Sequence, residues 1–89
     1  MERLFMRKFE YVIKNDAGIH ARPAGELVKT SSTFKSKITL QCNGKEADCK
    51  KLFSILKMGI KKGDLITLIF DGEDEEEAFT TITAQIGAK

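Results

Sequence analysis

The chain is organised around Gly18-Ile19-His20-Ala21-Arg22-Pro23-Ala24, a stretch that contains its only histidine and its only proline. Asn15, Asp16 and Gly18 are residue types that favour turns. Pro23 suits the first turn of a helix, because its ring fixes φ and its missing N–H would have had no helical acceptor there. The stretch therefore predicts a turn that leads directly into a helix.

His20 is expected at or beside the N-cap of that helix. The free N–H groups and aligned peptide dipoles at this end favour an anion and disfavour the imidazolium form, which keeps the ring nucleophilic. We therefore expect His20 to accept a phosphoryl group on an imidazole nitrogen. Ala21 and Arg22 are expected to bind the phosphate, since a guanidinium offers two parallel donors. The alternative is a turn histidine that merely lies near an arginine.

The length of 89 residues predicts one domain, residues 1–89, with one hydrophobic core. The net charge of +2 is too balanced to indicate nucleic acid or a membrane surface as a partner. The longest apolar run, residues 65–70, is far too short to cross a bilayer. Charged residues interrupt residues 1–8, which excludes a signal-peptide pattern there. We expect a cytoplasmic protein that does not insert into a membrane.

Two cysteines, Cys42 and Cys49, are expected to be buried structural thiols. No further cysteine and no nearby histidine completes a metal-ligand set, so we expect no metal and no cofactor. A disulfide is disfavoured in the cytoplasm. A tight turn at Asn43-Gly44 would also place Cys42 opposite Lys45 and leave Cys49 out of register for pairing.

The hydrophobic pattern predicts seven secondary-structure elements. Alternating apolar and polar residues indicate strands at residues 7–14, 37–42, 45–49 and 65–70. Helical spacing of apolar residues indicates helices at residues 21–32, 50–57 and 74–86. Four strands with one apolar face, covered by helices on that face only, make a two-layer α+β domain.

The helix expected at residues 50–57 carries more apolar side chains than a small domain usually buries. Phe53 is expected on its exposed face, in contact with a partner, near Leu52 and Leu56. The alternative is that these side chains belong to the core, which we favour for Leu52 or Ile55 individually. Basic residues that could surround this patch and attract an acidic partner are Arg22, Lys29, Lys50, Lys51 and Lys57. Each of them could equally be a solvated surface charge.

Residues 15–24 resemble the active-site signature of the HPr family, the histidine-containing phosphocarriers of the bacterial phosphoenolpyruvate:sugar phosphotransferase system. The resemblance continues in the family's order and spacing through Asn43-Gly44-Lys45, Lys50, Leu52-Phe53, Gly59, Lys62-Gly63 and Gly72-Glu73-Asp74-Glu75. It covers nearly the whole chain from Phe9 onward. It implies an open-faced sandwich in which three helices cover one face of a four-stranded antiparallel sheet.

The resemblance also implies a function and partners. His20 would take a phosphoryl group from an enzyme I-like donor and pass it to an enzyme IIA-like acceptor of the sugar-specific enzyme II components. The protein would be a carrier and not an enzyme, and we expect a monomer. The family's use of one docking surface, made of the active-site loop and the short helix, implies docking roles for Ile19, Lys29, Lys50, Leu52, Phe53 and Leu56.

The sequence departs from the family at Lys51, where many members carry a serine that a dedicated kinase phosphorylates. Lysine has no hydroxyl, so we expect no serine regulation at this position, and Ser54 does not match the regulatory site. Two lysines at the start of a helix oppose its dipole, so Asp48 is expected to act as the cap.

Two other functions are compatible with this kind of fold. An HPr-like module could retain the histidine and act mainly as a regulatory binding protein with little transfer activity. A four-stranded α+β sheet could also bind nucleic acid. The outward sheet positions are Lys, Glu, Thr and Gln, without a pair of stacking aromatic residues, so we expect no nucleic-acid partner.

Overall fold

The computed structural model describes residues 6–14, 16, 18–19 and 21–87. Their elements, in chain order, are β1 (Arg7–Val12), α1 (Ala21–Ser31), β2 (Lys37–Cys42), β3 (Lys45–Asp48), α2 (Leu52–Leu56), β4 (Leu65–Asp71) and α3 (Glu75–Gly87). The predicted order of strands and helices is confirmed. β1 ends two residues earlier than the sequence pattern predicts, and α2 begins two residues later and ends one residue earlier.

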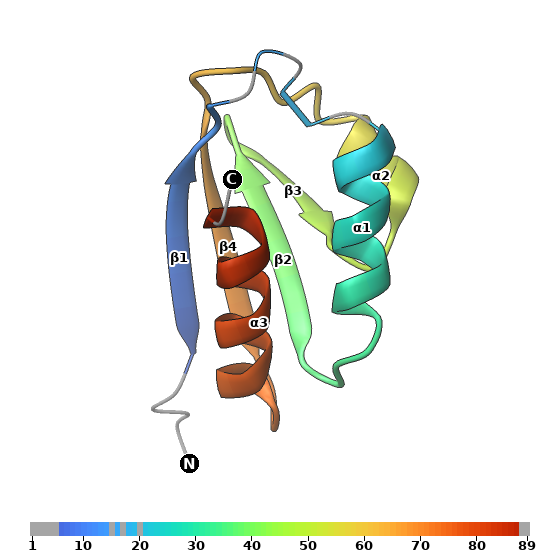
Figure 1. Ribbon diagram of the computed structural model, residues 1–89, viewed down its shortest axis with the longest axis vertical. Coiled ribbons are helices and arrows are strands. Elements are labelled where there is room, and N and C mark those ends of the chain that lie inside the picture. The colour runs from blue at the N-terminus through green and yellow to red at the C-terminus, as the bar shows by residue number, and fades with distance from the viewer. Residues whose placement is uncertain (1–5, 15, 17, 20, 88–89) are drawn as a thin grey trace.

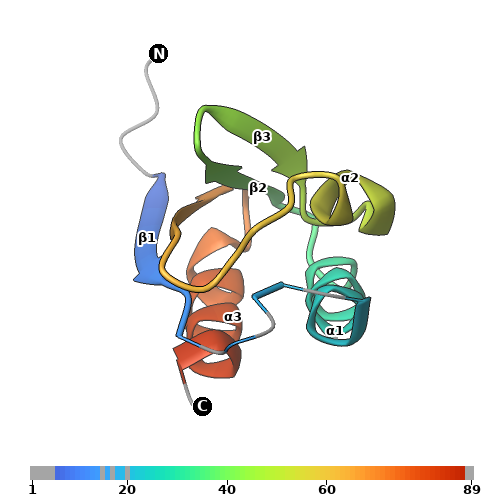
Figure 2. The same ribbon diagram turned by 90° about the horizontal axis from the view of Figure 1, so that it is seen from above.

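The four strands form one antiparallel sheet in the order β1-β4-β2-β3. The register aligns Phe9, Leu68, Leu40 and Ala47 in one row across all four strands. The three helices cover the face on which this row lies, and the opposite face is open (Figures 1 and 2). The fold is therefore the expected open-faced sandwich, with β4 inside the sheet.

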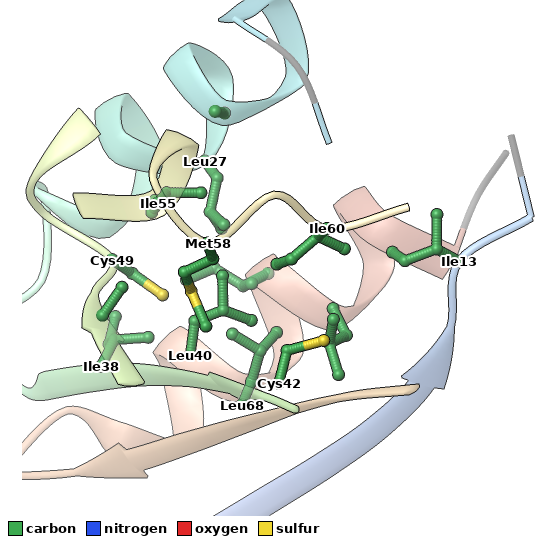
Figure 3. Packing of buried hydrophobic residues seen from close by; sticks show 14 of the residues in the cluster. Ile13, Leu27, Ile38, Leu40, Cys42, Cys49, Ile55, Met58, Ile60 and Leu68 are labelled. Atoms are coloured by element: carbon green, nitrogen blue, oxygen red, sulfur yellow. The ribbon is translucent and has the colours of Figure 1, made fainter. Parts of the chain in front are cut away.

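The core lies between the sheet and the helices. Apolar and polar residues alternate along β2 and β4, so one side of each strand is buried. On α1 and α3, apolar residues at helical spacing form the buried face. The buried apolar side chains from these elements are Ala24, Leu27, Ile38, Leu40, Cys42, Ile66, Leu68, Phe70, Ala78 and Ile82. Met58 and Ile60 join them from the chain after α2 (Figure 3). Burying one such large apolar side chain contributes about 2 kcal/mol.

Both cysteines are free and buried. Cys42 is opposite Lys45 in the hairpin register, as the turn signal predicts. Cys42 and Cys49 occupy separate places in the core cluster (Figure 3). Burial, with a smaller effect of the Asp48 charge, raises the pKa of Cys49 to about 12. The Cys49 thiol is therefore protonated at neutral pH and packs as a small apolar group.

Asp74 connects the segment between α1 and β2 to the start of α3. Its carboxylate accepts the Lys35 N–H at 2.8 Å and the Ser36 N–H at 2.9 Å, and it also accepts the Ser36 hydroxyl. These bonds favour the charged form, and the Ser36 hydroxyl contributes most to lowering the pKa of Asp74 to about 2. Asp74 thus closes the end of the sandwich at which α3 begins.

We expect the Asp74→Asn variant to be less stable than the parent at neutral pH, with a difference that shrinks in acid. The unfolded carboxyl has a pKa of about 3.9. The stabilisation is therefore fully present above about pH 4 and is lost as the pH falls through the folded pKa of about 2. Urea unfolding followed by circular dichroism at neutral pH and at two acid pH values measures the difference. A difference that stays constant with pH would contradict this assignment.

Candidate functional site

The first turn of α1 is the part of the site nearest to the predicted phosphoryl acceptor in sequence. α1 begins at Ala21, the residue after His20, and includes Pro23 near its start. His20 itself lies outside the described residues. No acidic side chain occupies the first turn, and the Arg22 side chain is exposed. Because no carboxylate there offsets the positive end of the helix dipole, this end favours an anion.

The loop that leads into α1 lies beside the turn that precedes β4. We call residues 13–19 the site loop and residues 60–64 the supporting turn. The Ile13 N–H donates to the Asp64 carbonyl at 2.9 Å, and the Gly63 N–H donates to the Ile13 carbonyl at 2.8 Å. The Ile19 N–H donates to the Ile60 carbonyl at 3.2 Å. The two segments meet at the end of the molecule where α1 begins (Figures 1 and 2).

Gly18 lies against the backbone of the supporting turn. It is buried, with φ of 67°, in the left-handed region that favours glycine. A Cβ at this position would lie 2.3 Å from the Ile60 carbonyl oxygen and 2.9 Å from the Lys61 Cα. Both neighbours are backbone atoms, so no side-chain rotation relieves the clash. The contact therefore requires glycine at this position of the site loop.

An exposed ion pair adds a further link. Lys62 Nζ lies 2.9 Å from Asp16 Oδ1, and the two side chains are 59% and 92% exposed. Pairs this exposed are worth about 0–1 kcal/mol. The backbone contacts at Ile13, Gly18 and Ile19 therefore determine the position of the loop more than the ion pair does.

A groove of about 620 Å³ lies beside the start of α1. Its lining includes Tyr11 and Ile13, Gly18 and Ile19 from the site loop, Arg22, and Gln85 near the end of α3. The groove therefore gives the Arg22 side chain an open space next to the site loop. Among the described residues, no group of three or more His, Cys, Asp and Glu side chains is arranged to hold a metal ion.

The short helix α2 lies beside α1 (Figure 1). Phe53 is 75% exposed, which confirms the prediction that it lies on the outer face. Leu52 and Leu56 are half-buried and pack against the core, and Ile55 is buried. The Phe53 ring is therefore available for contact with a partner.

The predicted basic residues have different environments. Lys29 is exposed in the last turn of α1. Lys50 is half-buried, and its Nζ donates to the Phe34 carbonyl at 2.8 Å. This bond ties Lys50 to the chain after α1. Ile19, the other predicted docking residue, is half-buried against the core.

The prediction that Asp48 caps α2 is wrong, because Asp48 lies three residues before the N-cap position. Lys51 is the N-cap residue and makes no side-chain cap hydrogen bond. Asp48 Oδ1 instead accepts the Lys50 N–H at 2.9 Å, and the Asp48 carbonyl accepts the Lys51 N–H. Asp48 therefore closes the turn that follows β3, and its side chain bonds to Lys50 and not to an N–H group of α2.

Residues of the supporting turn were not among the predicted site residues. Gly63 and Asp64 are residue types that favour turns, so the sequence could indicate a turn there. The contact between this turn and Gly18 could not be predicted from the sequence, because the two segments are distant in the chain. No helix in the described part of the chain has the length and apolar character needed to cross a membrane.

Comparison with known proteins agrees with this architecture. Residues 7–87 match the family described as PTS HPr component phosphorylation site. The phosphocarrier protein HPr of Mycoplasma genitalium is 45% identical over 80 residues, which cover 89% of this chain and 91% of that protein.

Two solved structures extend the comparison. The histidine-containing phosphocarrier protein of a mycoplasma superposes with a TM-score of 0.85 and 39% identity, over 86% of this chain and 88% of that one. HPr from Thermoanaerobacter tengcongensis superposes with a TM-score of 0.86 and 34% identity, over 92% of each chain. Sequence motif, fold and relatives agree, and the chain belongs to the HPr family, the phosphocarrier proteins of the phosphotransferase system.

Proposed function

We propose that His20 is the residue that carries the phosphoryl group. The observation that supports this most directly is that α1 begins immediately after the only histidine of the chain, with no acidic residue in its first turn. An imidazole nitrogen attacks the phosphorus of the donor, a nitrogen–phosphorus bond forms, and the bond from phosphorus to the donor breaks. Transfer to the acceptor is the same exchange with a new nucleophile.

Ala21 and Arg22 bind the phosphoryl group in this proposal. The backbone at Ala21 begins the helix, where N–H groups without helical acceptors point toward an anion. The exposed Arg22 guanidinium supplies two parallel donors that match two phosphoryl oxygens. Together they stabilise the negative charge of phosphohistidine without a metal ion or cofactor.

The partners in this proposal are an enzyme I-like donor and an enzyme IIA-like acceptor. The docking surface combines the site loop with α2 and the end of α1, through Ile19, Lys29, Lys50, Leu52, Phe53 and Leu56. The protein acts as a monomer in the cytoplasm, as one domain spanning residues 1–89. Serine phosphorylation has no acceptor hydroxyl at Lys51, so control at this position is absent.

The proposal is tested by incubation with phosphoenolpyruvate and a bacterial enzyme I. We expect one phosphoryl adduct that is labile in acid and stable in base, as a nitrogen–phosphorus bond requires. Peptide mass spectrometry at alkaline pH locates the adduct. An adduct on a serine or threonine, or no adduct at all, would contradict the proposal.

We expect the Phe53→Ala variant to bind the donor more weakly and to keep the stability of the parent. Phe53 is 75% exposed, so its truncation removes little buried area. Loss of an aromatic anchor from an interface costs on the order of 1–3 kcal/mol of binding free energy. Titration calorimetry with enzyme I and thermal melting measure the two effects.

Met6→Ala is the matched control for this prediction. Met6 is 51% exposed and directly precedes β1. The start of β1 lies on a different part of the molecule from α2 (Figure 1). Its truncation should change neither binding nor melting. If Phe53→Ala instead lowers the melting temperature with unchanged affinity, Phe53 serves the fold and the docking surface lies elsewhere.

A further inference from the structure

The side chain of Asp64 closes the supporting turn. Asp64 Oδ2 accepts the Lys61 N–H at 2.9 Å, and the Asp64 N–H donates back to the Lys61 carbonyl at 3.0 Å. The same carboxylate oxygen lies 3.4 Å from Asn43 Nδ2, at the tip of the β2–β3 hairpin. The carboxylate therefore holds the turn in shape and braces it against the hairpin.

This turn holds the site loop at both of its ends. At the beginning of the loop, the Asp64 carbonyl accepts the Ile13 N–H and the Gly63 N–H returns a bond to Ile13. At its end, the Ile60 carbonyl accepts the Ile19 N–H and lies against Gly18. Ile19 directly precedes His20 in the chain. A shift of the Ile60 carbonyl would therefore move the residue adjacent to the proposed phosphoryl acceptor.

We propose that Asp64 is a positioning residue for phosphoryl transfer, acting through the supporting turn on the site loop. This role rests on the proposed function of His20. Asp64 is half-buried and contributes no apolar surface to the core, so its main structural effect is on the turn. Loss of its Oδ2 atom leaves the Lys61 N–H without its acceptor and loosens the Ile60 carbonyl. Since small displacements of a reacting group slow transfer strongly, the effect should reach the reaction rate.

The test compares Asp64→Ala, Asp64→Asn and a control, Asp74→Ala, as substrates of enzyme I. Asp64→Ala should lower kcat roughly tenfold with little change in KM, because the docking surface on α2 is intact. Asp64→Asn should restore the parent rate, since its carboxamide oxygen can accept the Lys61 N–H. Asp74→Ala removes a carboxylate that also accepts backbone N–H groups, at the opposite end of the sandwich. It should lower stability and leave kcat unchanged.

Amide hydrogen exchange gives a second measurement that does not depend on transfer. The Ile19 amide should exchange faster in Asp64→Ala than in the parent, and Asp64→Asn should restore its protection. A parent kcat in Asp64→Ala, or a failure of Asp64→Asn to restore the rate, would overturn the positioning role. Unchanged Ile19 exchange would overturn it as well. If the parent protein accepts no phosphoryl group but Ile19 exchange changes as expected, the proposed function is wrong while the link between turn and loop is correct.

Discussion

The His20→Ala variant should form no phosphoryl adduct with phosphoenolpyruvate and enzyme I, under conditions in which the parent is fully labelled. The imidazole nitrogen is the proposed nucleophile, and alanine has no atom that can form the bond to phosphorus. The chain contains no second histidine to take its place. We therefore expect a loss of labelling below detection in intact-protein mass spectrometry.

The control measurement for this variant is that it folds like the parent. His20→Ala removes none of the described residues of the hydrophobic core. Circular dichroism and thermal melting should therefore match the parent, and enzyme I should still bind through α2. Undiminished labelling of this variant would show that the phosphoryl group is carried elsewhere.

Gly18→Ala is expected to be the most disruptive substitution in the site loop. An alanine Cβ would lie 2.3 Å from the Ile60 carbonyl oxygen, at a backbone φ of 67° that strains any side-chain-bearing residue. Left-handed strain and a clash with fixed backbone together should cost roughly 2–5 kcal/mol of unfolding free energy. The forced separation of the two segments should also slow transfer, because Ile19 loses its bond to Ile60. Urea unfolding and enzyme I-dependent phosphorylation measure the two effects.

Gly59→Ala separates the strain from the clash. Gly59 has a similar φ of 62°, but a Cβ there would meet no atom within 4 Å. Left-handed strain alone should therefore lower the unfolding free energy of Gly59→Ala, by about 1–2 kcal/mol. Equal losses of stability in the two variants would show that the site loop can move away from Ile60 without cost.

The site loop and α2 have separate structural supports. The loop is held by backbone contacts to the supporting turn, whereas α2 is held by Ile55 in the core and by its packing against α1. This separation predicts that changes at Phe53 affect KM and changes at Asp64 affect kcat. The two classes of variant can therefore be told apart in one kinetic assay.

The amino-acid sequence by itself determined the order of the elements and the apolar face of β2, β4 and α1. Period-two alternation in β2 and β4 and helical spacing in α1 are local signals, and the buried residues of these elements agree with them. Asn43-Gly44 placed the hairpin, and the exposed ring of Phe53 followed from the crowding of apolar residues on one short helix. The histidine motif likewise indicated the family without any coordinates.

Only the tertiary structure decided how segments distant in the chain meet. Gly18 could be identified as a turn residue, but its contact with Ile60 depends on how two loops are brought together at one end of the sheet. The same holds for Asp74 at Ser36, Lys50 at the Phe34 carbonyl, and Asp64 at the hairpin tip. A local pattern records which face of an element is apolar. It does not record which distant backbone N–H or carbonyl a polar side chain will reach, because that partner is set by the packing of the whole chain.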